Sequence, residues 1–173
     1  EGIHRLWPGL NIVVSTATPT GRTIVRDRLG HLAPHCYFPF DLPGPIKRAL
    51  KAIRPTFFVA LETEIWPNFF RELSRWGIPA MIANGRISDH SFRRYRLVRV
   101  FMRRPLRQIG MFAMQSAEDA RRIIALGALP ERVVVTGNLK TESSPHDASV
   151  ESLWRRLHGL SGSEPVWSAG STP

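Results

Sequence analysis

The sequence predicts an α/β fold, a doubly wound and Rossmann-like parallel sheet, on two observations. Short apolar segments alternate with segments of helical pattern along most of the 173 residues. The apolar segments are hydrophobic at consecutive positions, which is typical of parallel strands buried on both faces. Strands of this kind that alternate with helices indicate right-handed crossovers within one parallel sheet.

The expected elements follow one another in a regular order. We expect strands at residues 11–16, 35–40, 57–61, 78–83, 111–114 and 133–135. We expect helices at residues 18–29, 43–53, 65–76 and 117–126, the last closed by Gly127. An arginine-rich helical segment between residues 86 and 107 is expected to break at Pro105.

The chain is expected to divide into three parts. Residues 1–137 form the Rossmann-like domain, with its first strand missing, and the polar, turn-rich residues 138–149 form an interdomain linker. Residues 150–173 are interpreted as the truncated start of a second domain. The apolar strand there runs into a loop typical of donor phosphate binding, formed by Gly170, Ser171 and Thr172. Both ends look cut, so we interpret the chain as an interior fragment of a longer protein.

Several function classes are disfavoured by what the sequence lacks. The single cysteine, Cys36, excludes an internal disulfide framework, and the scattered histidines indicate no metal site. No apolar run approaches the roughly 18 residues that a membrane helix needs, and no signal peptide is visible. The absence of a phosphate-binding Walker loop, a dinucleotide fingerprint and a serine–histidine–acid order disfavours an NTPase, a dehydrogenase and a hydrolase.

Positive charge is concentrated in one segment. The chain carries 24 Lys and Arg against 14 Asp and Glu, a net charge of +10. Residues 86–107 hold eight arginines and one aspartate, which is +7 of that total. Such a stripe indicates a polyanionic partner: nucleic acid, an anionic membrane or a phosphorylated ligand. Nothing like a recognition helix or an aromatic stacking platform supports nucleic acid.

The basic segment has an amphipathic pattern. Helical spacing gathers on one side a predicted membrane or acceptor-phosphate face of Arg93, Arg96, Arg99, Arg103 and Arg107. The bulky apolar residues Leu97, Val98 and Phe101 fall mostly on the other side. This pattern favours contact with an anionic membrane surface. The alternative, a solvated helix packed on the sheet, would not need so many arginines.

Two carboxylates, Glu62 and Glu64, follow the buried strand at residues 57–61. Ligands of open α/β sheets bind at the carboxyl ends of the strands. Acidic groups beside a buried strand are costly unless they are paired, hydrated or used in function, so both residues are candidates for a catalytic site. The alternative is that Glu62 is an acid favoured by the dipole at a helix start.

Other polar motifs follow neighbouring strands and would converge on the same edge. The candidate acceptor-binding or substrate-binding residues in them are Thr18, Thr20, Gly21, Asn84, Arg86, Ser88 and Lys140. Each motif has a structural alternative: a helix cap at Thr18, a turn with a solvated arginine at Arg86, and a hinge at Lys140. Residues 115–119 are better interpreted as a capping box, in which Ser116 caps and Asp119 is the third helical residue.

Seven strings, in this order, resemble the family of 3-deoxy-D-manno-octulosonic acid (Kdo) transferases of lipopolysaccharide assembly. They are residues 15–21 (STATPTG), 38–43 (FPFDLP), 61–68 (LETEIWPN), 82–88 (IANGRIS), 115–119 (QSAED), 126–128 (LGA) and 135–140 (VTGNLK). The string at 61–68 is specific. The resemblance covers nearly the whole chain.

The resemblance implies the N-terminal half of a two-domain GT-B glycosyltransferase. Such an enzyme transfers Kdo from CMP-Kdo to a lipid A precursor at the cytoplasmic face of the bacterial inner membrane, with no metal or other cofactor. Its general base and membrane anchor are expected upstream of this chain, so the chain alone is predicted to be inactive. Glu62 and Glu64 would support the base, and Arg86 and Lys140 would meet acceptor phosphate or developing negative charge.

Two other functions stay open at this level. One is a non-catalytic basic module that binds anionic lipid. The other is a different GT-B transferase that acts on lipid-linked sugars.

Overall fold

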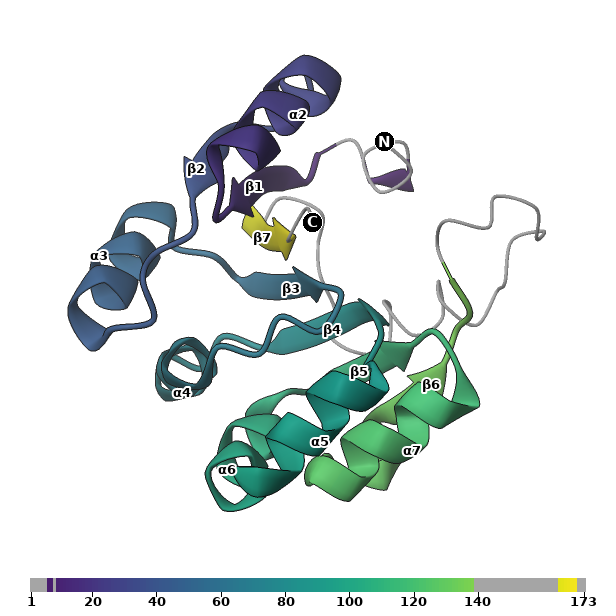
Figure 1. The fold of residues 1–173 in the computed structure, drawn as a ribbon. Coiled ribbons are helices and arrows are strands. Elements are labelled where there is room, and N and C mark those ends of the chain that lie inside the picture. Colours follow the sequence, from purple (N-terminus) through teal and green to yellow (C-terminus); the bar gives the residue numbers. More distant parts are fainter. Residues whose placement is uncertain (1–5, 8, 139–164, 171–173) are drawn as a thin grey trace.

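The computed structural model describes residues 6–7, 9–138 and 165–170, and its strands form one parallel sheet (Figure 1). The sheet has seven strands in the order β2-β1-β7-β3-β4-β5-β6, and every neighbouring pair is parallel. Their bounds are β1 Asn11–Thr16, β2 His35–Tyr37, β3 Phe57–Leu61, β4 Ala80–Gly85, β5 Met111–Met114, β6 Val133–Val135 and β7 Pro165–Gly170. The α/β fold class predicted from the sequence is confirmed.

Helices follow the strands where the sequence places them, and proline marks several of their starts. The bounds are α2 Pro19–Leu29, α3 Pro43–Ile53, α4 Pro67–Arg75 and α7 Ala117–Leu126, with a short 3₁₀ helix η1 at Pro130–Arg132. Helix α4 begins two residues later than expected. A proline disfavours helical geometry in the residue before it, and Trp66 is accordingly extended, with φ −107° and ψ 98°.

The basic segment forms two helices, α5 (Asp89–Leu97) and α6 (Arg99–Gln108). The predicted break at Pro105 is wrong, because the chain turns at Val98 and Pro105 lies inside α6. The buried side of α6 consists of Met102, Pro105 and Leu106. Packing of this side against the core keeps the proline within the helix, although it removes one backbone hydrogen bond. None of the described helices is long and apolar enough to cross a bilayer.

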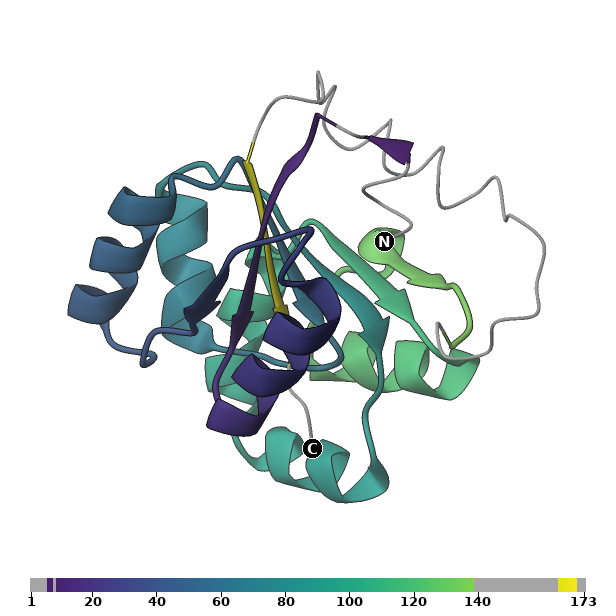
Figure 2. The ribbon, with the colours of Figure 1, turned by 90° about the horizontal axis from the view of Figure 1, so that it is seen from above.

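Strand β7 belongs to the same sheet. It lies in the middle of this sheet, paired with β1 on one side and β3 on the other (Figures 1 and 2). The expected division of the chain into two domains and a linker stays a prediction. Ser168 aligns with both Val14 and Val59, and Gly170 aligns with Leu61. A strand in this position satisfies the backbone groups of two edges that would otherwise stand unpaired. The expected linker, residues 138–149, lies outside the described residues from 139 onward.

Alternating side chains along the central strands divide the core into two faces. Phe58 and Ala60 of β3 pack with the buried residues of the helices, whereas Phe57 and Val59 face a smaller cluster on the other side of the sheet. Phe69, at the start of α4, lies 4.8 Å from Phe58 between ring centroids. This packing places the loop between β3 and α4 at the carboxyl edge of the sheet.

Candidate functional site

A cavity of about 200 Å³ lies at the carboxyl ends of β3 and β4. The first turns of α5 contribute Ser91 and Tyr95 to the wall of this cavity. It is lined by Glu62, Thr63, Glu64, Arg86, Ile87, Ser88, Ser91 and Tyr95. The structure therefore brings together four residues singled out in the sequence, from two strings more than twenty positions apart: Glu62, Glu64, Arg86 and Ser88.

Two residues at this edge have left-handed backbone geometry. Glu62 has φ 61° and Asn84 has φ 56°, backbone angles that residues other than glycine rarely adopt. The N–H of Glu62 donates to the carbonyl of Ala83 at 2.9 Å, one step beyond the end of β3. The pairing of β4 with β5 shifts register between Ile82 and Gly85, around Asn84. Strained backbone at two adjacent strand ends is a common feature of functional sites.

The loop that carries Glu62 and Glu64 is held at its far end by Asp41. The carboxylate of Asp41 accepts from the N–H groups of Asn68 at 3.2 Å and Phe69 at 2.8 Å. The amide of Asn68 donates in return to the carbonyl of Asp41 at 2.8 Å. Asp41 thus supplies the helix cap that Trp66 cannot give, and the strings at 38–43 and 61–68 meet for a structural purpose.

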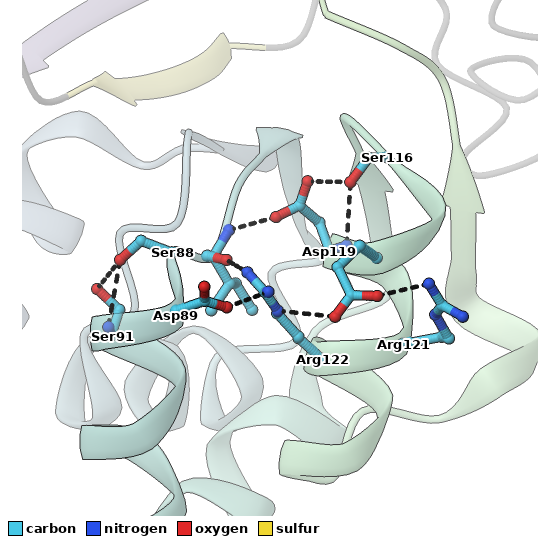
Figure 3. Close-up of polar contacts among 9 residues, drawn as sticks. Ser88, Asp89, Ser91, Ser116, Asp119, Arg121 and Arg122 are labelled. Atoms are coloured by element: carbon cyan, nitrogen blue, oxygen red, sulfur yellow. Dashed lines mark hydrogen bonds and ion pairs between the residues drawn. The ribbon is translucent and has the colours of Figure 1, made fainter.

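A polar network from α7 holds the segment that carries Arg86 and Ser88 (Figure 3). Asp119 accepts from the N–H of Ile87 at 2.7 Å, and Nη1 of Arg122 donates to the carbonyl of Ile87 at 2.5 Å. Arg122 also contacts the carboxylates of Asp89 and Glu118. The predicted cap at Ser116 is confirmed, because its Oγ accepts from the N–H of Asp119 at 3.1 Å, and the carboxylate of Asp119 contacts that same hydroxyl.

Groups of opposite charge, among them Glu64 and Arg86, line the cavity. Among the described residues, the ion pairs include neither Glu64 nor Arg86. Burial raises the pKa of Tyr95, the nearby charge of Glu64 raises it further, and Arg94 acts in the opposite direction. Carboxylates accept hydrogen bonds from hydroxyl groups, and a guanidinium pairs with an anion. The cavity is therefore suited to a hydroxylated ligand that carries negative charge.

Comparison with known proteins identifies the family. The family model described as 3-deoxy-D-manno-octulosonic-acid transferase (kdotransferase) matches residues 1–143. The chain belongs to the Kdo transferase family.

Its relatives include transferases from several bacteria. A 3-deoxy-D-manno-octulosonic acid transferase of Haemophilus influenzae is 33% identical over 96% of this chain and 39% of its own length. A bifunctional glycosyltransferase/methyltransferase of Fusobacterium nucleatum is 35% identical over 94% of this chain and 26% of its own length. A 3-deoxy-D-manno-octulosonic acid transferase of Chlamydophila psittaci is 32% identical over 78% of this chain and 31% of its own length. The chain spans less than half of these relatives.

Other strings that resemble the Kdo transferase family do not reach the cavity. Thr18 caps α2, since its Oγ accepts from the N–H of Gly21 at 3.1 Å, which matches the structural alternative for this motif. Neither of these residues nor Thr20 lines the cavity, and β7 separates their strand from β3. Asn84 is buried at the bulge rather than exposed to the cavity.

The predicted donor phosphate loop and the predicted lysine are only partly described. Gly170 is the last residue of β7 and aligns with Leu61, one residue before Glu62. Lys140, Ser171 and Thr172 lie outside the described residues. Among the described residues, no three His, Cys, Asp or Glu side chains gather as a metal ion would require.

The five arginines of the predicted membrane face are all exposed on α5 and α6: Arg93, Arg96, Arg99, Arg103 and Arg107. Two of the apolar residues expected on the opposite side, Leu97 and Phe101, do not pack inward. They are 88% and 78% exposed, and Val100 between them is 84% exposed, whereas Met102 is buried. The turn between the two helices therefore presents a group of exposed apolar side chains, Leu97, Val98, Val100 and Phe101, which we name the apolar tip.

Three polar cavity residues were not among the candidates from the sequence: Thr63, Ser91 and Tyr95. Thr63 stands between the two glutamates and gave no separate signal. Ser91 and Tyr95 follow Ser88 by three and seven positions, a spacing that puts all three on one side of a helix. A search for polar residues at this spacing could have found them.

Proposed function

We propose that this chain supplies the acceptor-binding part of a transferase that moves Kdo from CMP-Kdo to a lipid A precursor in lipopolysaccharide biosynthesis. Membership of the Kdo transferase family supports the reaction. The observation that carries the site assignment is the cavity in which Glu64 and Arg86 face a common space without an ion pair between them.

The cavity groups divide into two roles in this proposal. The carboxylates of Glu62 and Glu64 accept hydrogen bonds from acceptor sugar hydroxyls, and Arg86 pairs with an acceptor phosphate. A base outside these 173 residues removes the proton of the attacking hydroxyl. The hydroxyl oxygen bonds to the anomeric carbon of Kdo as the bond from that carbon to the CMP phosphate breaks. Glu62 or Glu64 orients or tunes that base.

The test replaces the carboxylates one at a time in the complete protein that contains this chain. We expect Glu64→Gln and Glu62→Gln to lower kcat for Kdo transfer at least about tenfold, because each removes an interaction that positions the acceptor. The matched control is Glu131→Gln, an exposed carboxylate of η1 that does not line the cavity, which should leave kcat unchanged. Unchanged turnover in both variants would remove the two glutamates from the site.

We also propose that an anionic membrane surface, the cytoplasmic face of the inner membrane, is the partner of α5 and α6. The apolar tip is exposed and flanked by the arginines of both helices, and Asp89 is the one acidic residue in the two helices. An apolar group surrounded by cations matches an interface where acyl chains lie beneath anionic headgroups. Nucleic acid would match the charge but not the exposed Leu97 and Phe101.

Vesicle binding tests this partner. The chain should co-sediment with vesicles of phosphatidylethanolamine and phosphatidylglycerol, and much less with phosphatidylcholine vesicles. Arg96→Gln with Arg99→Gln should weaken binding about tenfold or more, whereas Lys47→Gln with Lys51→Gln, a charge-matched control on α3, should not. Leu97→Ser with Phe101→Ser should weaken binding at unchanged net charge. Tighter binding to duplex DNA than to anionic vesicles would contradict the proposal.

A further inference from the structure

The segment from Asn84 to Ser88 is irregular, yet its backbone is hydrogen-bonded nearly throughout. The carbonyls of Asn84 and Gly85 accept from the side chain and the N–H of Gln115, at 3.0 and 2.8 Å. The N–H and carbonyl of Arg86 both bond to the hydroxyl of Thr63. Both backbone groups of Ile87 bond to α7, as described above. An irregular segment is held this completely only when several elements contribute partners.

Thr63 connects the two halves of the cavity wall. Its hydroxyl accepts from the N–H of Arg86 at 2.9 Å and also donates to the carbonyl of the same residue. Thr63 lies between Glu62 and Glu64, so this single hydroxyl ties the loop that carries the carboxylates to the segment that carries the guanidinium. A hydroxyl can donate one hydrogen bond and accept another at the same time.

Asp119 holds the same segment from the opposite side. Its side chain is buried, at 7% exposure, and one carboxylate oxygen accepts from Ile87 while the other contacts the hydroxyl of Ser116. Ile87 is itself 1% exposed, so its N–H has no access to water as a substitute partner. Arg86 and Ser88, on either side of Ile87, are exposed and line the cavity.

We propose that Thr63 and Asp119 are positioning residues of the transferase site. Thr63 sets the separation between the glutamate loop and Arg86, and Asp119 anchors Ile87 so that Arg86 and Ser88 project into the cavity. The part of the inference that concerns the reaction rests on the proposed function. The part that concerns the segment does not, and the two are tested separately.

Amide hydrogen exchange on the 173-residue chain tests the anchoring. Thr63→Val keeps the shape of the side chain but removes both bonds, and should speed exchange at Arg86 about tenfold. Asp119→Ala should do the same at Ile87, whereas Asp119→Asn keeps an oxygen that can accept from Ile87 and should preserve slow exchange. Arg121→Ala, which removes an exposed ion pair on α7, is the matched control. Unchanged exchange at both amides would overturn the proposal.

Kinetics of the complete protein test the link to catalysis. Thr63→Val and Asp119→Ala should lower kcat for Kdo transfer at least about tenfold per folded molecule, and Asp119→Asn should restore most of it. Loss of thermal stability with unchanged kcat would show a structural role only and overturn the proposal. If the unsubstituted complete protein transfers no Kdo, the proposed function fails, while the exchange experiment still decides whether the segment is anchored.

Discussion

Two polar loops at the carboxyl edge of the sheet use their hydrogen bonds differently. The loop after β1, residues 16–21, is held mainly by a contact within the loop: the hydroxyl of Thr18 accepts from the N–H of Gly21, three positions further along the chain. Thr16 adds two distant contacts: its hydroxyl lies 2.9 Å from Nε2 of His35, and its carbonyl accepts from the N–H of Phe38 at 3.0 Å. The loop after β4, residues 84–88, is held by Thr63, Gln115, Asp119 and Arg122, between 23 and 35 positions away.

The difference separates a helix start from a candidate site. Local capping consumes the hydroxyl of Thr18 and satisfies one of the free N–H groups of the helix. Distant partners instead satisfy the backbone after β4 and leave the side chain of Arg86 at the cavity, whereas the hydroxyl of Ser88 caps α5 by accepting from the N–H of Ser91 at 3.2 Å. Both loops belong to strings that resemble the Kdo transferase family, but one of them lines the cavity and the other does not.

The largest expected effect tests the distant anchoring. Asp119→Ala should lower the free energy of unfolding by about 3 kcal/mol, because it leaves the buried N–H of Ile87 without its carboxylate acceptor and removes the contact of that carboxylate with the hydroxyl of Ser116. Equilibrium urea unfolding of the chain measures this. A loss no larger than that of a local cap would erase the distinction between the two loops.

A distant helix cap should have an intermediate effect. Asp41→Ala removes the acceptor of two N–H groups at the start of α4, one of them from the buried Phe69, and should cost about 2 kcal/mol. The same urea titration applies. Asp27→Ala, at an exposed carboxylate on α2, is the control and should change stability by less than about 0.5 kcal/mol.

The local cap should matter less. Thr18→Ala should cost about 1 kcal/mol of unfolding free energy, the usual value for a helix N-cap. Thr20→Ala, two positions away in the same exposed turn, should be close to neutral. If Thr18→Ala cost more than Asp119→Ala, the ranking of distant over local contacts would be wrong.

The smallest expected effect concerns the electrostatics of the cavity. In a Tyr37→Phe background, absorbance titration reports Tyr95 alone, and its pKa should lie above the ordinary value of 10.0. Glu64→Gln should lower that pKa but leave it above the ordinary value for tyrosine, because burial is the larger cause of the shift. A pKa unmoved by Glu64→Gln would place Glu64 away from Tyr95.

The raised pKa also predicts a pH dependence. Since the folded state holds the proton of Tyr95 more tightly than the unfolded chain does, the free energy of unfolding should fall as the pH rises above 10.0.

Much of the fold could be predicted from local pattern. Runs of consecutive apolar residues marked every strand within a few positions, and proline or glycine marked several helix ends, because these signals depend on neighbours along the chain. The break within the basic segment could not be predicted in this way. Pro105 is a local signal for a helix end, and packing of Met102 and Leu106 outweighs it.

The candidate site also has a part that could be predicted from the sequence and a part that depends on contacts between distant segments. Glu62, Glu64, Arg86 and Ser88 could be named from the sequence, since polar residues that follow buried strands collect at one edge of a parallel sheet. Thr63 and Asp119 could not be assigned their contacts, because the partner of each lies in another loop. Asp119 looked like an ordinary member of a capping box, and nothing near it in the sequence points to Ile87.

By itself, the sequence determined the family, the alternation of strands and helices, the local helix caps at Thr18 and Ser116 and the concentration of positive charge, because each depends on residue type and short spacing. The tertiary structure decided the position of β7 between β1 and β3, the exposure of the apolar tip, and the contacts of Thr63 and Asp119. These features depend on which segments meet in space. Backbone groups must find partners and apolar faces must find neighbours, and both conditions are met by residues far apart in the chain.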